Sequence, residues 1–325
     1  MSGKQVTNGR AFEYALAWTY AQDLGSRGVE VNVLENGDWA DCRKAFKSCT
    51  KEDQDGYVRA ARQTVETLCR LEPGLTRSAF KGDVLNIKLM PTAAGKQGDV
   101  RDVVFWREKN GKSVWEIGIS AKNNHDAVKH SRISPTIDFG KEWLDIPCST
   151  RYMETVGTIF KQVDDARKSG YKTWKDLGRE FKVERVYKPL LEAFKTEFLQ
   201  LCSRNEEKVV VRRLLEYLVG RYPFYKVIKH DRQNVVVVKA FNFIKGMGQA
   251  YGKMKPDVVP EAIHLPSRVI EMECSHDSAM LIMDEGWQLK FRIHNAEKEL
   301  VNSLKWDVQM VGNPPVLFSQ YLFGS

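Results

Sequence analysis

The segment that most constrains the fold is the pair of apolar runs on either side of Asn110-Gly111. The runs 100–106 and 114–121 are rich in β-branched and aromatic residues. Asn-Gly favours a two-residue turn between antiparallel strands, because both central residues of that turn have positive φ. The sequence therefore predicts a β-hairpin whose strands are joined at Asn110-Gly111.

This turn also sets an expected register, in which Asp99 lies opposite Lys122. Because side chains alternate between the two faces of a strand, one face would be mostly polar and the other almost wholly apolar. The polar face would carry Asp99, Arg101, Val103, Phe105, Glu116, Ser120 and Lys122. The apolar face, expected to be buried, would carry Val104, Trp106, Trp115, Ile117, Ile119 and Ala121, with Asp102 as its one charge. One β-bulge would reverse this assignment.

The rest of the chain mixes helical and strand-like patterns. Helical spacing of apolar residues predicts helices over 11–24, 53–71, 152–168, 189–202 and 206–222. Apolar runs predict strands over 83–90, 235–240, 268–274, 286–294 and 303–311. No regular alternation of strand and helix runs along the chain. We therefore expect a mixed α/β (α+β) fold, with a mixed sheet flanked by helices and with helical and β-rich additions towards the C-terminus.

The composition suits a globular protein, and we expect it to stay in the cytoplasm. No apolar run reaches the roughly 18 residues that cross a bilayer, and the polar first ten residues lack the apolar core of a secretory signal. The six cysteines are scattered without a CxxC pair, so we expect free thiols rather than zinc or disulfides. The formal charge of +8 and the pI of about 9.0 weakly favour a polyanionic partner.

One aspartate, one further acid and one lysine would provide the parts that phosphodiester hydrolysis needs. The reaction requires one or two hard cations, which prefer carboxylate oxygens. It also requires a positive group that orients the attacking water or stabilises the pentacovalent phosphate. The small residues Gly118 and Ser120 leave room for a bulky ligand. The alternative is an ordinary surface salt bridge, which stabilises a fold by only about 0–1 kcal/mol.

Two stretches of the hairpin resemble the core of the PD-(D/E)xK nucleases. They are 98–105 (GDVRDVVF) and 115–122 (WEIGISAK), in which Ser120 stands where the second acid is usual. The runs 9–16 (GRAFEYAL), 116–132 (EIGISAKNNHDAVKHSR) and 290–295 (KFRIHN) more closely resemble the HaeIII family of type II restriction endonucleases. The resemblance implies a restriction-endonuclease-like core and Mg²⁺-dependent cleavage of double-stranded DNA at a short palindrome, GGCC for the enzyme that gives the family its name.

Within this pattern Lys122 is the predicted catalytic lysine, and the first metal-binding acid is Asp99 or Asp102. The hairpin register favours Asp99, because that residue would share a face with Lys122. The resemblance favours Asp102, because there an acid is followed directly by an apolar run. Both remain candidates for catalysis and metal binding.

The second metal-binding acid is expected from outside the hairpin. Glu116 lies six residues from Lys122, about 20 Å along an extended strand, which is too far to share a metal. Glu13 on the first predicted helix is the better candidate, since nucleases of this fold often place an acid there. The alternative role for Glu13 is an ordinary solvent-exposed charge on the helix. Glu142 is a weaker candidate for the second metal-binding acid.

Two polar groups are predicted to contact DNA. Asparagine pairs well with adenine, arginine with guanine, and lysine with phosphate. The alternatives are an ordinary polar loop and short helix for the first group and a solvated strand face for the second. Lys290, Arg292 and His294 would share one strand face. The predicted contacts are Asn123, Asn124, His125, Lys129, His130 and Arg132 in the first group, and Lys290, Arg292, His294 and Asn295 in the second.

These patterns give an expected division of roles along the chain. Residues 1–150 would form the catalytic nuclease core, 151–222 a helical segment, and 223–325 a β-rich part that contacts DNA, with all three packed as one unit. A repair or recombination nuclease of the same fold, and a basic DNA-binding protein without catalysis, are the alternative functions. A homodimer would suit a palindrome, although some restriction enzymes act as monomers. A cognate methyltransferase would act on the same site without forming a complex.

Overall fold

The computed structural model describes residues 3–91, 94, 98–124, 127–295 and 297–324, and the side chains of these except at 3–5, 127 and 130. The chain forms two compact units, which are described separately. Unit 1 comprises Met1–Asp126, Gly220–Ile263 and Val316–Ser325, and unit 2 comprises Ala127–Val219 and His264–Pro315. Each unit is assembled from segments far apart in the sequence. The expected roles of 1–150, 151–222 and 223–325 stay predictions, because compactness does not assign roles to segments.

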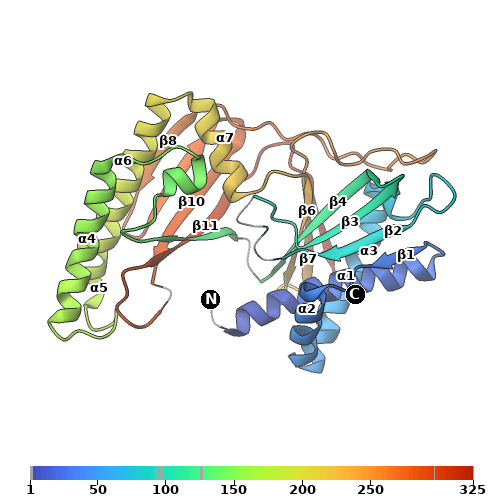
Figure 1. The fold of residues 1–325 in the computed structure, drawn as a ribbon, viewed down its shortest axis with the longest axis horizontal. Coiled ribbons are helices and arrows are strands. Elements are labelled where there is room, and N and C mark those ends of the chain that lie inside the picture. Colours follow the sequence, from blue (N-terminus) through green and yellow to red (C-terminus); the bar gives the residue numbers. More distant parts are fainter. Residues whose placement is uncertain (1–2, 92–93, 95–97, 125–126, 296, 325) are drawn as a thin grey trace. The chain divides into compact units, whose positions relative to one another are not determined.

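Unit 1 is built on a mixed sheet with helices packed against it (Figure 1). Its described strands follow the order β1-β2-β3-β4-β6-β7-β12, in which β1–β2 and β4–β6 are parallel pairs and the others antiparallel. The strands are β1 (Val31–Val33), β2 (Leu85–Leu89), β3 (Val103–Lys109), β4 (Lys112–Asn123), β6 (Phe224–His230), β7 (Val235–Phe241) and β12 (Ser319–Phe323).

The helices of unit 1 are α1 (Gly3–Ser26), α2 (Gly37–Ser48), α3 (Lys51–Leu71) and the 3-10 turn η1 (Pro73–Leu75). Helix α1 is the central one, because it packs against α2, α3 and β4. Tyr14 contacts Trp39 of α2, and Phe12 contacts Tyr57 of α3. On the sheet side, the Tyr20 ring contacts Phe105. A helix surrounded in this way must be apolar on most of its circumference. A charged residue on it therefore needs polar partners or a function.

The predicted hairpin is present, but its register differs from the expected one. Near the turn, Lys109 pairs with Lys112 and Glu108 with Ser113, as a two-residue turn requires. A bulge then shifts the pairing by one residue, so that Arg107 lies opposite Trp115 and Phe105 opposite Ile117. The extra residue is Val114, which is exposed.

The bulge corrects the assignment of faces. Val103 and Phe105, expected on the polar face, are buried in the core together with Trp115, Ile117, Ile119 and Ala121. Val104 and Trp106, expected to share that apolar face, pair with Gly118 and Glu116 instead. The physical reason is that one inserted residue turns every following side chain to the opposite face. The register argument for Asp99 is therefore wrong.

Unit 2 contains an antiparallel sheet with the order β5-β11-β10-β9-β8 among its described strands. Helices α4 and α6 lie along one side of this sheet in Figure 1. The strands are β5 (Ala127–Ile133), β8 (Val269–Cys274), β9 (Ser278–Met283), β10 (Gln288–His294) and β11 (Leu304–Gly312). The helical elements are η3 (Gly140–Leu144), α4 (Thr150–Lys168), α5 (Gly178–Glu180), η4 (Phe181–Tyr187), α6 (Lys188–Arg204), α7 (Glu207–Leu218) and η5 (Asp284–Gly286).

Helices and strands together confirm the mixed α/β class. The six cysteines are free thiols, as expected from their spacing. Among the helices of the described residues, none combines the length and the apolar character that crossing a membrane requires.

Candidate active site

The acid and the lysine that the structure brings together are Asp102 and Lys122. Lys122 lies near the end of β4, and Asp102 lies in the bend just before β3. The Lys122 Nζ is 3.7 Å from Asp102 Oδ2, and the two side chains are 22% and 24% exposed. The same oxygen accepts hydrogen bonds from the Ala121 N–H at 2.6 Å and the Ser120 hydroxyl at 3.2 Å. The carboxylate is thus fixed in place yet reachable from solvent.

Asp99, the other candidate, is paired with Arg101. The Arg101 guanidinium donates from Nε and Nη2 to the two Asp99 oxygens, both at 2.8 Å, and from Nη1 to Glu116 Oε1 at 2.5 Å. The Tyr222 ring lies 4.5 Å from the guanidinium carbon. The Arg101 side chain passes directly over Gly118, where a Cβ would collide with it. These contacts make Asp99 and Glu116 partners of a mostly buried arginine.

Glu13 is the third charged group at this end of unit 1. It lies on α1 between Phe12 and Tyr14, which are both buried. Burial and the nearby negative charge of Asp102 raise the pKa of Glu13 to about 7, while Arg10 and Lys122 counteract that rise. The structure therefore brings Glu13, Asp102 and Lys122 into one electrostatic group.

Two further residues hold the Glu13 carboxylate. The Cys42 thiol of α2 donates to Glu13 Oε2 at 3.6 Å, and the Arg10 Nη1 donates to the Cys42 sulfur at 3.3 Å. Arg10 also lies 3.6 Å from Asp38. Neither Cys42 nor Arg10 was predicted from the sequence. One signal in the sequence could have found them. A helix rich in alanine and aromatic residues is expected to be buried, and a single buried acid on such a helix needs polar partners.

The chemistry of these donors fits a small hard cation such as Mg²⁺. Among the described residues, no cluster of three or more His, Cys, Asp and Glu side chains could hold a metal. Mg²⁺ does not need one, because it commonly binds through one or two carboxylates and keeps several waters. Asp102 and Glu13 supply two carboxylates, and the negative charge of Asp102 adds to burial in raising the pKa of Glu13. A cation bound by both would offset the repulsion between the two charges.

The predicted DNA contacts of unit 1 follow Lys122 directly. Asn123 donates from Nδ2 to the Tyr57 hydroxyl at 3.3 Å. Asn124 has a positive φ of 61°, and the N–H of Asp231, just after the neighbouring strand β6, donates to Asn124 Oδ1 at 2.8 Å. The Asn124 side chain thus has a structural partner within unit 1. His125 lies outside the described residues.

The remaining predicted residues belong to unit 2. Residues 127–133, for which the sequence predicts no strand, form strand β5, and Lys129 donates from Nζ to the Tyr217 carbonyl at 2.7 Å. Asn295 donates to the Glu297 carbonyl at 2.8 Å. Glu142, the weaker alternative for the second acid, lies on η3 and so not in the unit that holds Lys122. Arg132, Lys290, Arg292 and His294 lie on the strands of the unit 2 sheet, and the His130 side chain is not described.

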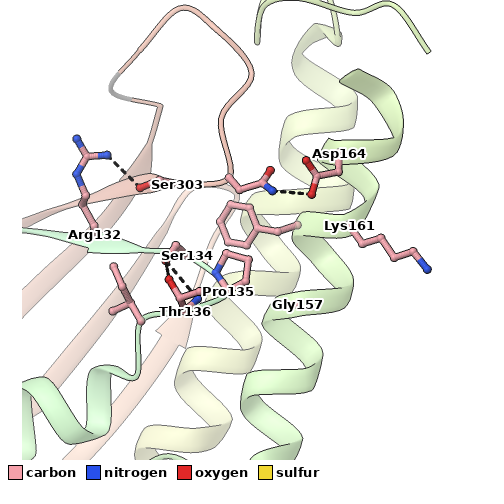
Figure 2. Close-up of a pocket in the computed structure, with 11 residues that line it drawn as sticks. Arg132, Ser134, Pro135, Thr136, Gly157, Lys161, Asp164 and Ser303 are labelled. Carbon is pink, nitrogen blue, oxygen red and sulfur yellow. Dashed lines mark hydrogen bonds between the residues drawn. The ribbon is translucent and has the colours of Figure 1, made fainter. Parts of the chain in front are cut away.

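Unit 2 also contains a pocket of about 600 Å³ beside α4, shown in Figure 2. Its carboxylate, Asp164, accepts a hydrogen bond from Asn302 at 2.6 Å, and the Lys161 side chain extends away from it. The pocket therefore lacks the close pairing of acid and lysine that unit 1 shows at Asp102 and Lys122.

Comparisons with known proteins point to one family. The sequence model of the HaeIII restriction endonuclease family matches residues 9–314. The chain is 32% identical over 323 residues to the type II restriction enzyme HaeIII of Haemophilus aegyptius, which covers 98% of this chain and 97% of that enzyme. No solved structure matches the chain.

Proposed function

Because this chain belongs to the HaeIII restriction endonuclease family, we propose that it cleaves double-stranded DNA at the palindrome GGCC with Mg²⁺ as cofactor. The family makes the chain a type II site-specific deoxyribonuclease, as its sequence led us to expect. The comparisons favour this activity over a repair nuclease or a DNA-binding protein without catalysis. The observation that carries the proposed chemistry is the group formed by Glu13, Asp102 and Lys122.

In this proposal Asp102 and Glu13 hold the metal. Mg²⁺, when bound, supplies positive charge at the scissile phosphate and makes a bound water more acidic. The hydrogen bonds from Ala121 and Ser120 fix the Asp102 carboxylate, so little ordering is needed when the cation and DNA arrive. Ser120 stands where the PD-(D/E)xK pattern usually has an acid. Here it acts through Asp102, and Glu13 supplies the second carboxylate.

Lys122 contributes the fixed positive charge. Its ammonium lies 3.7 Å from Asp102 Oδ2, so a phosphate bound beside Asp102 would lie close to this charge. Lys122 donates to a non-bridging phosphate oxygen and offsets the negative charge that develops during attack. Its three N–H donors also allow it to orient the attacking water.

The test is digestion of unmethylated, sequenced plasmid DNA in Mg²⁺, followed by mapping of the ends. We expect discrete fragments that all end within GGCC, and no cleavage in EDTA. Plasmid DNA methylated within GGCC should resist cleavage. Random nicking, or fragments that end at another sequence, would contradict the proposed site. Absence of any cleavage in Mg²⁺ would contradict the proposed reaction.

A matched pair of lysine variants tests the proposed active site. Lys122→Ala should abolish cleavage while leaving binding of a GGCC duplex within a few-fold of wild type. Lys112→Ala removes the same charge from the exposed start of the same strand and should cleave normally. Equal activity in the two variants would exclude Lys122 from catalysis.

The proposed partners are double-stranded DNA and a second copy of the chain. A two-fold dimer matches the symmetry of a palindrome. Size-exclusion chromatography with light scattering, with and without a GGCC duplex, distinguishes a dimer from a monomer. The cognate methyltransferase is proposed to protect the same site without binding this chain. We propose that the enzyme works in the cytoplasm.

A further inference from the structure

The sheet of unit 2 has two chemically different faces. Along β10, Leu289, Phe291 and Ile293 are buried, and the Phe291 ring contacts Phe194 of helix α6. Because side chains alternate along a strand, the residues between them point to the other face. These are Lys290, Arg292 and His294, which are half-buried or exposed.

The neighbouring strand extends the same polar face. Residues paired across an antiparallel ladder point to the same side of the sheet. Lys305 of β11 pairs with His294, and on its other side with Arg132 of β5. One row across three strands therefore carries Arg132, Lys305 and His294. In Figure 2 the Arg132 guanidinium points away from the helix that carries Lys161 and donates to Ser303.

The next two rows place a carboxylate and an amide between the cations. Asp307 pairs with Arg292, and Gln309 pairs with Lys290. The Arg292 Nη2 lies 3.2 Å from Asp307 Oδ2, and the Gln309 amide donates to the same oxygen at 3.3 Å. We call this surface the basic sheet face; it consists of Arg132, Lys290, Arg292, His294, Lys305, Asp307 and Gln309.

The charge on this side of the sheet changes from one edge to the other. Four of its described side chains are cations, Arg132, Lys290, Arg292 and Lys305, and they outnumber the carboxylates of Asp307 and of Glu297, which lies 3.6 Å from Arg132. Towards the opposite edge, β8 presents the exposed residues Glu271 and Glu273. A polyanion would therefore be attracted to the half of the sheet made by β5, β11 and β10 and repelled from β8.

Arg292 differs from the other cations in how it is held. Its side chain is 49% exposed, whereas that of Asp307 is only 10% exposed. A buried carboxylate beneath a half-exposed guanidinium restrains the arginine while leaving most of its N–H donors for a ligand. A restrained guanidinium suits the bidentate recognition of guanine O6 and N7. A GGCC site offers guanines on both strands.

We infer that the basic sheet face of unit 2 binds the DNA duplex, with Arg292 reading a guanine and with Lys290 and Lys305 binding backbone phosphates. Asp307 is a positioning residue that orients Arg292. The inference rests on the proposed function only for the DNA sequence that is recognised. The binding of DNA by this face does not depend on it. The inference also assigns to this surface three residues that the sequence pattern did not indicate, Lys305, Asp307 and Gln309.

The test measures binding of the full chain, in EDTA, to fluorescent duplexes that contain GGCC or a scrambled sequence. Lys305→Ala should weaken binding to both duplexes alike and lower the salt dependence by about one phosphate contact. Arg292→Ala should weaken binding to the GGCC duplex by about tenfold or more and remove the preference for it. Arg292→Lys, which keeps the charge without the planar fork, should retain binding to the scrambled duplex and lose the preference.

The control is Lys168→Ala, which removes a positive charge from the exposed last turn of α4 and should bind like wild type. Thermal unfolding of each variant shows whether it is folded. Wild-type affinity in both Arg292→Ala and Lys305→Ala would overturn the inference. Plasmid digestion by the wild type decides the proposed function separately. If the wild type binds DNA but does not cleave at GGCC, loss of affinity in these variants still supports the surface, and normal affinity still refutes it.

Discussion

The Nζ of Lys122 lies 3.7 Å from Oδ2 of Asp102, although a two-residue turn with unbroken pairing would have put Asp99 opposite Lys122. The bulge at Val114 is the cause, because it shifts the pairing of β3 and β4 by one residue. The choice between the two aspartates therefore depends on a single inserted residue in the strand.

The two aspartates can be separated by matched variants. Asp102→Asn should reduce cleavage by at least about 100-fold with little change in Tm, because the amide keeps a similar shape but loses the charge that binds a cation. Asp99→Asn should instead lower Tm, because it weakens the buried pairing of Arg101. Cleavage rates measured well below the Tm of both variants check this. A greater loss of cleavage in Asp99→Asn would reverse the assignment.

Glu13→Gln should lose cleavage without losing stability. The raised pKa of Glu13 means that its charged form is disfavoured in the folded protein, so a neutral side chain of the same shape should keep or raise the Tm at pH 8. The variant should also bind Mg²⁺ more weakly in calorimetric titration. Glu30→Gln, an exposed residue of unit 1, is the control and should change neither property. Unchanged Mg²⁺ affinity in Glu13→Gln would remove Glu13 from the metal site.

Gly118→Ala should destabilise the fold. A Cβ at Gly118 would collide with the Arg101 side chain, which is held by Asp99, Glu116 and Tyr222 and cannot move freely. Overpacking of this kind lowers the free energy of unfolding by about 1–3 kcal/mol. Gly157→Ala in helix α4 meets no atom within 4 Å and should raise stability instead, because alanine favours a helix. Denaturant unfolding of both variants gives the comparison.

Glu72 should make the stability of unit 1 depend on pH. It is fully buried, and its Oε1 accepts hydrogen bonds from the Tyr225 hydroxyl and the Gly248 N–H, both at 2.8 Å. Burial raises its pKa from 4.5 to about 7. Between these values the folded protein keeps a proton that the unfolded chain has released. The contribution is therefore complete below about pH 4.5 and is lost as the pH rises to about 7.

The expected loss is about 3 kcal/mol over this range, since one pKa unit corresponds to about 1.4 kcal/mol. The free energy of unfolding, measured at pH 5 and pH 8, should fall less in Glu72→Gln than in wild type. Glu66 lies on the exposed side of helix α3, which ends just before Glu72, and Glu66→Gln should keep the wild-type difference. The same pH dependence in wild type and Glu72→Gln would show that Glu72 does not titrate in this range.

Several elements could be predicted because local patterns determine them. Helices α1, α3, α4 and α6 follow apolar residues at helical spacing, and the hairpin follows Asn110-Gly111. Strand β5 was not predicted, because its residues are polar and become a strand only by pairing with β11. Sheet pairing between distant segments leaves little trace in a local pattern.

The sequence alone determined the family and the residue types of the candidate site. The motifs around Lys122 resemble one family of restriction endonucleases, and the comparisons confirm that membership. A motif consists of residue types in a given order, and that order can be compared between proteins without knowledge of the fold.

The tertiary structure alone decided which of those residues meet. Lys122 and Asp102 come together through a bulge, and Glu13 approaches them because α1 packs against β4. Lys305 joins Arg132 and His294 only because β11 lies between β5 and β10. The physical reason is that charges interact through space, over a few ångströms, and the sequence fixes only their separation along the chain.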